Sequence, residues 1–261
     1  MAQEYHEAHG SYLGMNWAYV SDRGSRRENN EDRALVREMP GRLFAVVADG
    51  MGGHANGEFA SGVVTEALGD YFSANAHGTT ADSAAYANRV LAEKIGSMEG
   101  RPGAVAVWCV ARRESGVYTA ELGNVGDTRA YRISPDSITQ LTEDQSAVRE
   151  LRKQGKWNQM GPAERKRMAH VVTNAFCNEF RPEEVQAIRL ELAPGDYLAL
   201  FSDGVHGEDE GSDFRRFLSD DEIAAVVRSQ DDLMQRCSSV VHSAIERGSR
   251  DNASGLLLYF T

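Results

Sequence analysis

The sequence predicts an α+β protein in which antiparallel β-sheets pack together and α-helices cover them. Strand-like apolar segments follow one another along the chain with short turns between them. Longer segments with helical periodicity also follow one another, in two pairs. Strands joined directly to strands favour antiparallel pairing, and helices segregated from strands favour an α+β layer architecture.

The first half of the chain contains a predicted pair of strands and a predicted pair of helices. Residues 33–49 predict two strands that a Pro-Gly turn joins. Residues 58–75 predict a helix because apolar side chains recur on one face, and residues 80–98 predict a second helix for the same reason.

The second half continues with more strands. We expect an antiparallel meander of three strands at 104–112, 117–123 and 128–133. A short helix at 145–154 leads into a segment of mixed charge and poor periodicity, which predicts an irregular flap at about 155–185. The remaining segments predict strands at 185–192 and 197–204, helices at about 220–229 and 231–247, and a last strand at 254–260.

Length and composition predict one domain, residues 1–261, in a reducing compartment. No linker-like or repetitive segment divides the 261 residues. The three cysteines are far apart and form no CxxC pair, which argues against both disulfides and a zinc–thiolate site. The N-terminus lacks the basic and apolar regions of a signal peptide, and no apolar run is long enough to span a membrane. We therefore expect a cytoplasmic protein.

The formal net charge of −11 argues against two classes of partner. Nucleic acids and anionic membrane surfaces both require a basic face on the protein. An acidic protein that handles phosphate groups needs metal ions or a local arginine to offset the repulsion.

Four aspartates each flank a predicted buried strand. Asp32 and Asp251 precede strands, whereas Asp49 and Asp203 follow them. Each one alone is more simply explained as a turn residue. Together they would place several charges beside apolar strands, which is costly unless cations compensate them. Ligand sets made only of oxygen favour Mg²⁺ or Mn²⁺ over zinc.

Arg27 lies five residues before Asp32 and supplies a forked donor that suits phosphate oxygens. Its spacing alone fits equally well with an ordinary surface arginine in a charged loop. The choice between these interpretations depends on the motifs taken together.

Six segments occur in order along the chain: RENNED, VVADGMGGH, GNVGDTRAYRI, LTEDQSAV, LALFSDG and RGSRDN. With these motifs, the sequence resembles the bacterial metal-dependent serine/threonine protein phosphatases of the type 2C (PPM) family from about residue 18 onward. The resemblance implies two antiparallel sheets packed face to face, with helices on both outer faces. It also implies hydrolysis of phosphoserine and phosphothreonine by a metal-activated water.

The resemblance assigns metal ligands to individual residues. It implies two Mn²⁺ or Mg²⁺ ions, with Asp49 bridging both and the Gly50 carbonyl binding one, which glycine permits by turning the backbone toward the ion. Asp203 and Asp251 would hold the other ion. Asp127 resembles the aspartate of a third, weaker metal site, although a turn residue is the competing interpretation.

The resemblance also assigns supporting roles around the metals. Asp32, together with Glu31, would act through bound water in the outer coordination sphere. Arg27 would bind the substrate phosphate. His54 is a candidate proton donor to the leaving group, or alternatively holds the turn by hydrogen bonds. Gln145 departs from the family pattern, in which histidine is common at this position.

The expected partners are phosphorylated proteins, in particular a Ser/Thr kinase and its targets. Two alternatives remain open at this point. One is a catalytically weak pseudophosphatase that uses the same fold as a scaffold, and the other is a phosphatase of small phosphate esters. The basic residues Arg165, Lys166 and Arg167 in the flap suit acidic phosphopeptides.

Overall fold

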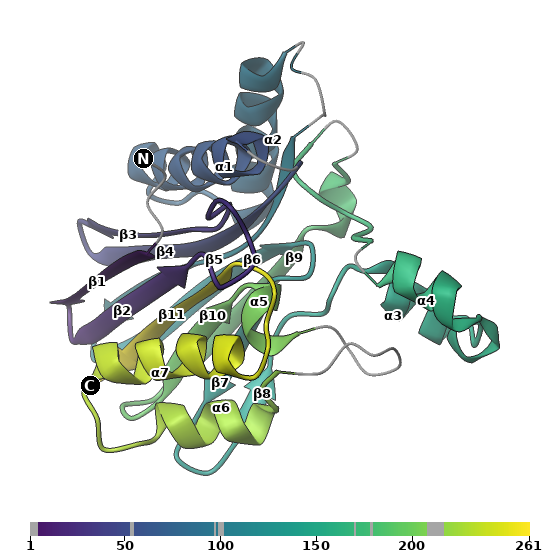
Figure 1. The fold of residues 1–261 in the computed structure, drawn as a ribbon. Coiled ribbons are helices and arrows are strands. Elements are labelled where there is room, and N and C mark those ends of the chain that lie inside the picture. The colour runs from purple at the N-terminus through teal and green to yellow at the C-terminus, as the bar shows by residue number, and fades with distance from the viewer. Residues whose placement is uncertain are drawn as a thin grey trace.

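Two antiparallel sheets, of six and five strands, form the centre of the computed structural model (Figure 1). The six-stranded sheet has the order β1-β2-β11-β10-β7-β8. Its strands span Tyr5–Tyr12 (β1), Met15–Asp22 (β2), Ala253–Phe260 (β11), Tyr197–Phe201 (β10), Arg129–Ile133 (β7) and Ile138–Gln140 (β8). The structure describes residues 5–52, 55–96, 98, 102–169, 171–177, 180–207 and 217–261.

The five-stranded sheet has the order β3-β4-β5-β6-β9. Its strands span Arg33–Met39 (β3), Arg42–Met51 (β4), Gly103–Glu114 (β5), Val117–Val125 (β6) and Gln186–Leu192 (β9). Side chains from both sheets interdigitate between them, among them Val47 and Val107 from this sheet and Leu200 and Leu256 from the other. These residues are fully buried, so the two sheets share one apolar layer.

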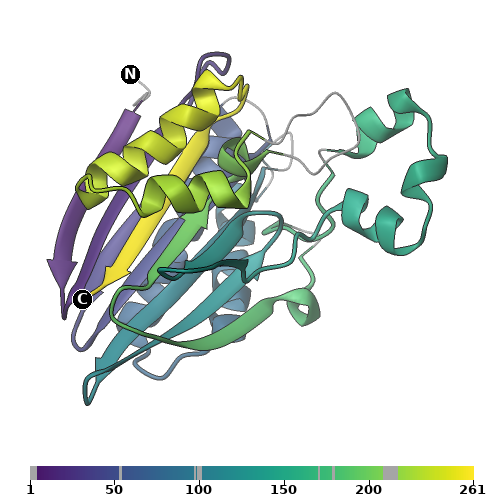
Figure 2. The same ribbon diagram turned by 90° about the horizontal axis from the view of Figure 1, so that it is seen from below.

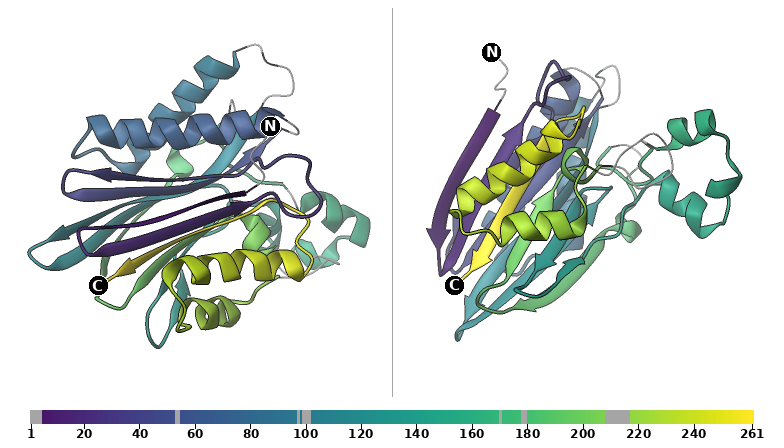
Figure 3. Two further views of the ribbon diagram at one scale, coloured as in Figure 1. Left: turned by 60° about the vertical axis from the view of Figure 1, so that its left-hand side comes forward. Right: turned by 60° about the horizontal axis from the view of Figure 1, so that its bottom comes forward.

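Helices cover both outer faces of this sandwich (Figure 3). Helices α1 (Ala55–Ala74) and α2 (Thr80–Ile95) pack on the five-stranded sheet. Helices α6 (Asp220–Val227) and α7 (Leu233–Glu246) pack on the six-stranded sheet. The predicted α+β class, with two packed antiparallel sheets flanked by helices, is therefore confirmed.

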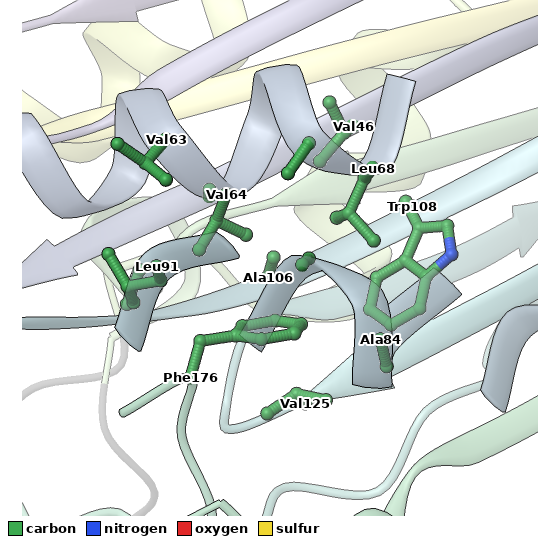
Figure 4. Packing of buried hydrophobic residues seen from close by; sticks show 14 of the residues in the cluster. Val46, Val63, Val64, Leu68, Ala84, Leu91, Ala106, Trp108, Val125 and Phe176 are labelled. Carbon is green, nitrogen blue, oxygen red and sulfur yellow. The ribbon is translucent and has the colours of Figure 1, made fainter. Parts of the chain in front are cut away.

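The outer layer on the five-stranded sheet shows why these helices form where they do. Val64 and Leu68 of α1 and Leu91 of α2 point toward Ala106 and Trp108 of β5 (Figure 4). Positions 64 and 68 are one helical turn apart and share a face, which explains the apolar periodicity of the sequence. Trp108 is completely buried at the centre of this contact.

The predicted meander of three strands is wrong in its last step. β5 pairs with β6, but β6 then pairs with β9, and β7 belongs to the other sheet between β10 and β8. The chain crosses between the sheets at Gly126, whose φ of 98° lies in the region that favours glycine. A turn that changes sheets has the same local composition as a hairpin turn, so the sequence does not distinguish them.

The β1–β2 hairpin was not predicted. β1 has no fully buried residue, because it is an edge strand whose side chains alternate between exposed and half-buried. A polar edge strand carries too weak an apolar pattern to be recognised from sequence alone.

The predicted short helix at 145–154 is present as α3 (Ala147–Lys153). The segment predicted as an irregular flap, at about 155–185, contains more regular structure than expected: the 3₁₀ turns η1 (Trp157–Gln159) and η2 (Pro182–Glu184), and α4 (Pro162–Met168). Because apolar side chains of α3 pack against this segment, we refer to residues 145–185 together as the flap. Pro162 at the first position of α4 and the basic residues in its last turn both favour a helix there. α3 and α4 lie apart from the sheets in both views (Figures 1 and 2).

Candidate metal and phosphate site

Strand register brings the predicted aspartates to one edge of the sandwich. In the six-stranded sheet, the end of β10 lies opposite the first residues of β11 and β7. Asp203 follows β10, and it begins the short helix α5 (Asp203–His206). Asp251 precedes β11 and Asp127 precedes β7, so all three lie at the same end of this sheet.

The five-stranded sheet contributes from the same edge. Asp32 immediately precedes β3, whose first residue is paired with Ala48 of β4. Asp49 follows Ala48 within β4 and is paired with Val105 of β5. The antiparallel pairing of β3 with β4 therefore places Asp32 beside Asp49.

Polar contacts between the sheets join the two sets of aspartates. The Ser202 hydroxyl donates to Asp32 Oδ2 at 2.8 Å, and the Ser254 amide donates to Ser202 Oγ at 2.9 Å. The Glu31 amide donates to Asn252 Oδ1 at 2.9 Å. Asp32 and Glu31 are almost fully buried. These contacts fix the distance between the two sheet edges.

The sequence analysis did not identify the serine and the asparagine that make these contacts. Ser202 immediately precedes Asp203, and Asn252 immediately follows Asp251. A polar residue next to a candidate metal ligand at the end of a buried strand is the signal that would have identified both.

Gly50 is required for a reason other than the predicted one. β4 continues through Met51, so the backbone does not turn at Gly50. A Cβ at this position would overlap the carbonyl oxygen of Gly57 in α1 and would lie 2.7 Å from that of Glu31. Close approach of two other backbone segments, rather than a turn, therefore demands glycine here.

The aspartates share an environment that disfavours their ionised forms. Burial, and then the charge of Asp251, together raise the pKa of Asp203 to about 7. Burial also raises the pKa of Asp32 to about 7. For Asp49, burial and then the charges of Asp32 and Asp203 hold the pKa well above its usual range. The edge thus carries more negative charge than its surroundings compensate.

Asp127 belongs to the same electrostatic group. Burial raises its pKa well above the usual range, and the charge that raises it most is that of Asp203. The structure thus brings the residue of the predicted third site next to a residue of the predicted main site.

The donor set of this edge fits a divalent cation. Asp203 Oδ1 is buried and has no hydrogen-bond partner among the residues that the structure describes. A buried carboxylate oxygen without a partner is costly, and a cation would supply the missing interaction. Within the same described ranges, no three His, Cys, Asp or Glu side chains already converge on one point.

Arg27 lies at the mouth of the site. Its Nη2 donates to Asp251 Oδ2 at 2.5 Å, although the two residues are 224 positions apart in the chain. The Arg27 side chain is 47% exposed, so it can be reached from solvent. The structure therefore brings together Arg27, the four strand-end aspartates and Asp127. The predicted proton donor His54 lies outside the described residues, as does the acidic sequence EDEGSD at 208–213.

Known proteins with similar sequences and folds are phosphatases. The sequence profile described as protein phosphatase 2C matches residues 23–244. Serine/threonine phosphatase stp of Listeria welshimeri is 27% identical over 259 residues, which cover 94% of this chain and 95% of that protein. Protein phosphatase PhpP of Streptococcus pneumoniae is 28% identical over 258 residues, with coverages of 94% and 97%.

Solved structures agree with this relationship. The serine/threonine phosphatase of S. agalactiae superposes with a TM-score of 0.80 at 25% identity, covering 95% of this chain and all of that one. The catalytic domain of PstP, solved in complex with two manganese ions, gives a TM-score of 0.73 at 26% identity, with coverages of 94% and 97%. No helix of the described segments is long and apolar enough to cross a membrane. The chain therefore belongs to the protein phosphatase 2C family and is a serine/threonine phosphatase.

Proposed function

We propose that this phosphatase uses two Mn²⁺ or Mg²⁺ ions held by Asp49, the Gly50 carbonyl, Asp203 and Asp251. The observation that carries the proposal is the buried Asp203 Oδ1, which lacks a partner within the described part of the chain. Oxygen-only ligands suit these hard cations. Asp127, whose pKa is raised by the charge of Asp203 more than by any other charge, is proposed to hold a third ion.

The chemistry that the ions supply is activation of a water molecule for attack on phosphorus and neutralisation of charge on the phosphoryl oxygens. The protein supplies the positions. The Ser202 hydroxyl fixes Asp32, which orients water in the outer coordination sphere. Arg27 is proposed to bind phosphoryl oxygens through the donors that it does not use on Asp251. The sequence further suggests His54 as proton donor to the leaving alcohol.

The proposed substrates are phosphorylated proteins, among them a Ser/Thr kinase and its targets. The basic part of the flap, residues 145–171, supports an acidic peptide as partner. It has seven Lys and Arg residues and two Glu residues, a formal net charge of +5 in a protein whose net charge is −11, whereas residues 172–185 have one Arg and three Glu residues. Lys156, Lys166 and Arg167 are exposed. The remainder of the molecule is strongly acidic, which disfavours nucleic acids and anionic membranes as partners.

The test compares hydrolysis of p-nitrophenyl phosphate and of a phosphothreonine peptide, with Mn²⁺ and with excess EDTA. Asp203→Asn is expected to lower kcat/KM by more than the roughly 10- to 100-fold typical of losing an outer-sphere partner. Asp136→Asn, in an exposed turn at the other end of β7, is the matched control and is expected to retain full activity.

Other outcomes would separate the remaining alternatives. Turnover of the small ester without turnover of the peptide would favour a phosphatase of small phosphate esters. Binding of Mn²⁺ without turnover of either substrate would favour a scaffold role. Turnover that EDTA does not reduce would contradict the proposed use of metal ions.

A further inference from the structure

Gln145 makes two hydrogen bonds to the turn that carries Asp127. The backbone amide of Gly126 donates to the side-chain Oε1 of Gln145 at 2.7 Å. The backbone amide of Gln145 donates to the Gly126 carbonyl at 3.0 Å. Asp127 is the next residue in the chain. The side chain and the backbone of Gln145 thus hold both backbone polar groups of Gly126, the residue that precedes this aspartate.

The same residue also ties together the two stems of the flap. Gln145 Nε2 donates to the carbonyl of Glu184 on the returning stem. The amide of Thr173 donates to the Gln145 carbonyl at 2.8 Å, and an isolated β-bridge joins Ser146 to Val172. One carboxamide therefore accepts from the Asp127 turn and donates to the far stem of the flap.

The Asp127 turn has little freedom to adjust if this contact changes. Gly126 has a φ of 98°, and a Cβ there would overlap the side chain of Val105. Asn124 Nδ2 donates to the Gly126 carbonyl at 3.2 Å, and the Thr128 hydroxyl donates to Asn124 Oδ1 at 3.1 Å. A tightly bounded turn passes a displacement on to its neighbours instead of absorbing it.

We propose that Gln145 is a positioning residue that couples the flap to the Asp127 turn, so that order in the flap and cation binding at Asp127 strengthen each other. The inference rests on the proposed role of Asp127 as a cation ligand. Coupling between two sites is reciprocal: whatever the flap does to cation affinity at Asp127, the cation does to the order of the flap.

The chemistry of the carboxamide explains why glutamine suits this position. It offers an acceptor to the Gly126 amide and a donor to the Glu184 carbonyl at the same time. Leucine has a similar size and offers neither. Neutral imidazole, the form present at pH 8, offers one of each, so Gln145→His is the variant expected to retain the coupling.

The experiment measures hydrogen exchange of the backbone amides, with EDTA and with saturating Mn²⁺ at pH 8, in the wild type, Gln145→Leu and Gln145→His. The control is Gln154→Leu, since Gln154 lies exposed at the end of α3. In EDTA, Gln145→Leu is expected to speed exchange of the Gly126 amide at least about 10-fold, because a buried donor loses its partner. Mn²⁺ is expected to slow exchange in residues 147–169 of the wild type but not of Gln145→Leu.

Calorimetric titration with Mn²⁺ separates this inference from the assignment on which it rests. Asp127→Asn is expected to remove the weakest binding event, and Gln145→Leu to weaken it about 10-fold, as outer-sphere partners typically do. If Asp127→Asn changes nothing, the cation role of Asp127 is wrong. If Asp127→Asn removes the event but Gln145→Leu leaves both the event and the response of the flap as in the wild type, the coupling through Gln145 is overturned.

Discussion

Among single residues, Arg27 offers the sharpest test of how the phosphate is bound. Its guanidinium already pairs with Asp251 and is half exposed at the mouth of the site. We expect Arg27→Ala to lower kcat/KM about 10- to 100-fold, because a hydrogen bond to a charged group contributes roughly 1.5–3 kcal/mol. Arg27→Lys keeps the charge but not the forked geometry, so it is expected to recover only part of this loss.

Steady-state kinetics together with Mn²⁺ titration check this prediction. The affinity for Mn²⁺ is expected to be retained in both variants, since arginine is no cation ligand. Arg189→Ala is a suitable control because this exposed arginine of β9 pairs with Glu121. A loss of kcat/KM that follows entirely from a loss of Mn²⁺ binding would show that Arg27 only organises Asp251.

The residues of the site illustrate what the sequence can and cannot provide. Each aspartate was recognisable because it adjoins an apolar strand, which is a local pattern. The pairing of Asp32 with Ser202 joins residues 170 positions apart, and no local pattern contains it. Gly50 was recognised for its composition, but its reason lies in the approach of Gly57 from α1.

Among the elements, the flap is the one whose exposed charged residues can most readily be replaced without unfolding it. Trp157 is buried among the apolar residues of α3 and α4, with the guanidinium groups of Arg152 and Arg165 5.7 and 5.6 Å from its ring centre. The flap thus has its own small core. Lys and Arg side chains at its exposed surface can therefore be replaced without disturbing this core.

We expect replacement of Lys156, Lys166 and Arg167 by serine to lower kcat/KM for phosphopeptides with acidic flanks and not for p-nitrophenyl phosphate. Opposite charges steer association, and the effect weakens as salt screens them. The measurement is kcat/KM for acidic and neutral phosphopeptides at low and high ionic strength. Fluorescence of Trp157 reports whether the flap core is intact.

Arg89→Ser with Lys94→Ser removes two exposed positive charges from α2, one fewer than the flap variant, and serves as the control for loss of positive charge outside the flap. This double variant is expected to treat both peptides as the wild type does. If the flap variant lost kcat/KM equally for acidic and neutral peptides, these Lys and Arg side chains would have no role in peptide selection.

Elements were predictable in proportion to how much apolar surface they bury. α1, α7 and most strands of the second half were found within a few residues, because their apolar residues form a periodic face or a continuous buried run, whereas the three-residue strand β8 was not predicted. β1 was missed because it is a polar edge strand. The crossing at Gly126 was mistaken for a hairpin. This crossing carries the chain from β6 of the five-stranded sheet to β7 of the six-stranded sheet, where Asp127 lies at the same end as Asp203.

For the whole molecule, the aspartates that the proposed function requires lower the stability of the fold when no metal is bound. The aspartates lie where the edges of the two sheets meet, so their mutual repulsion acts on the packing of the sandwich. In the fold, the pKa of Asp203 is raised to about 7, whereas an aspartate in an unfolded chain titrates near about 3.9. Without metal, its protonated form stabilises the fold fully below about pH 4, and this contribution is lost as the pH rises toward 7.

The effect of Asp203→Asn on stability is therefore expected to change sign when the metal is added. In EDTA at pH 8, the variant should melt at a higher temperature than the wild type, because a buried and uncompensated charge is gone. At 100 times the Kd, Mn²⁺ adds about 2.7 kcal/mol to the wild type, or about 5–10 °C in Tm. The variant should gain much less, so that the wild type becomes the more stable protein.

Thermal melts of both proteins at pH 5 and pH 8, with and without Mn²⁺, check this reversal. In EDTA the advantage of the variant should shrink at pH 5, where wild-type Asp203 is protonated and uncharged. Comparing the variant with the wild type at each pH cancels the contribution of other titrating groups, histidines included. A wild type that is more stable than the variant in EDTA at pH 8 would mean that Asp203 is compensated by the protein itself. The cation would then be unnecessary for folding this edge, and the strongest argument for its binding there would fall.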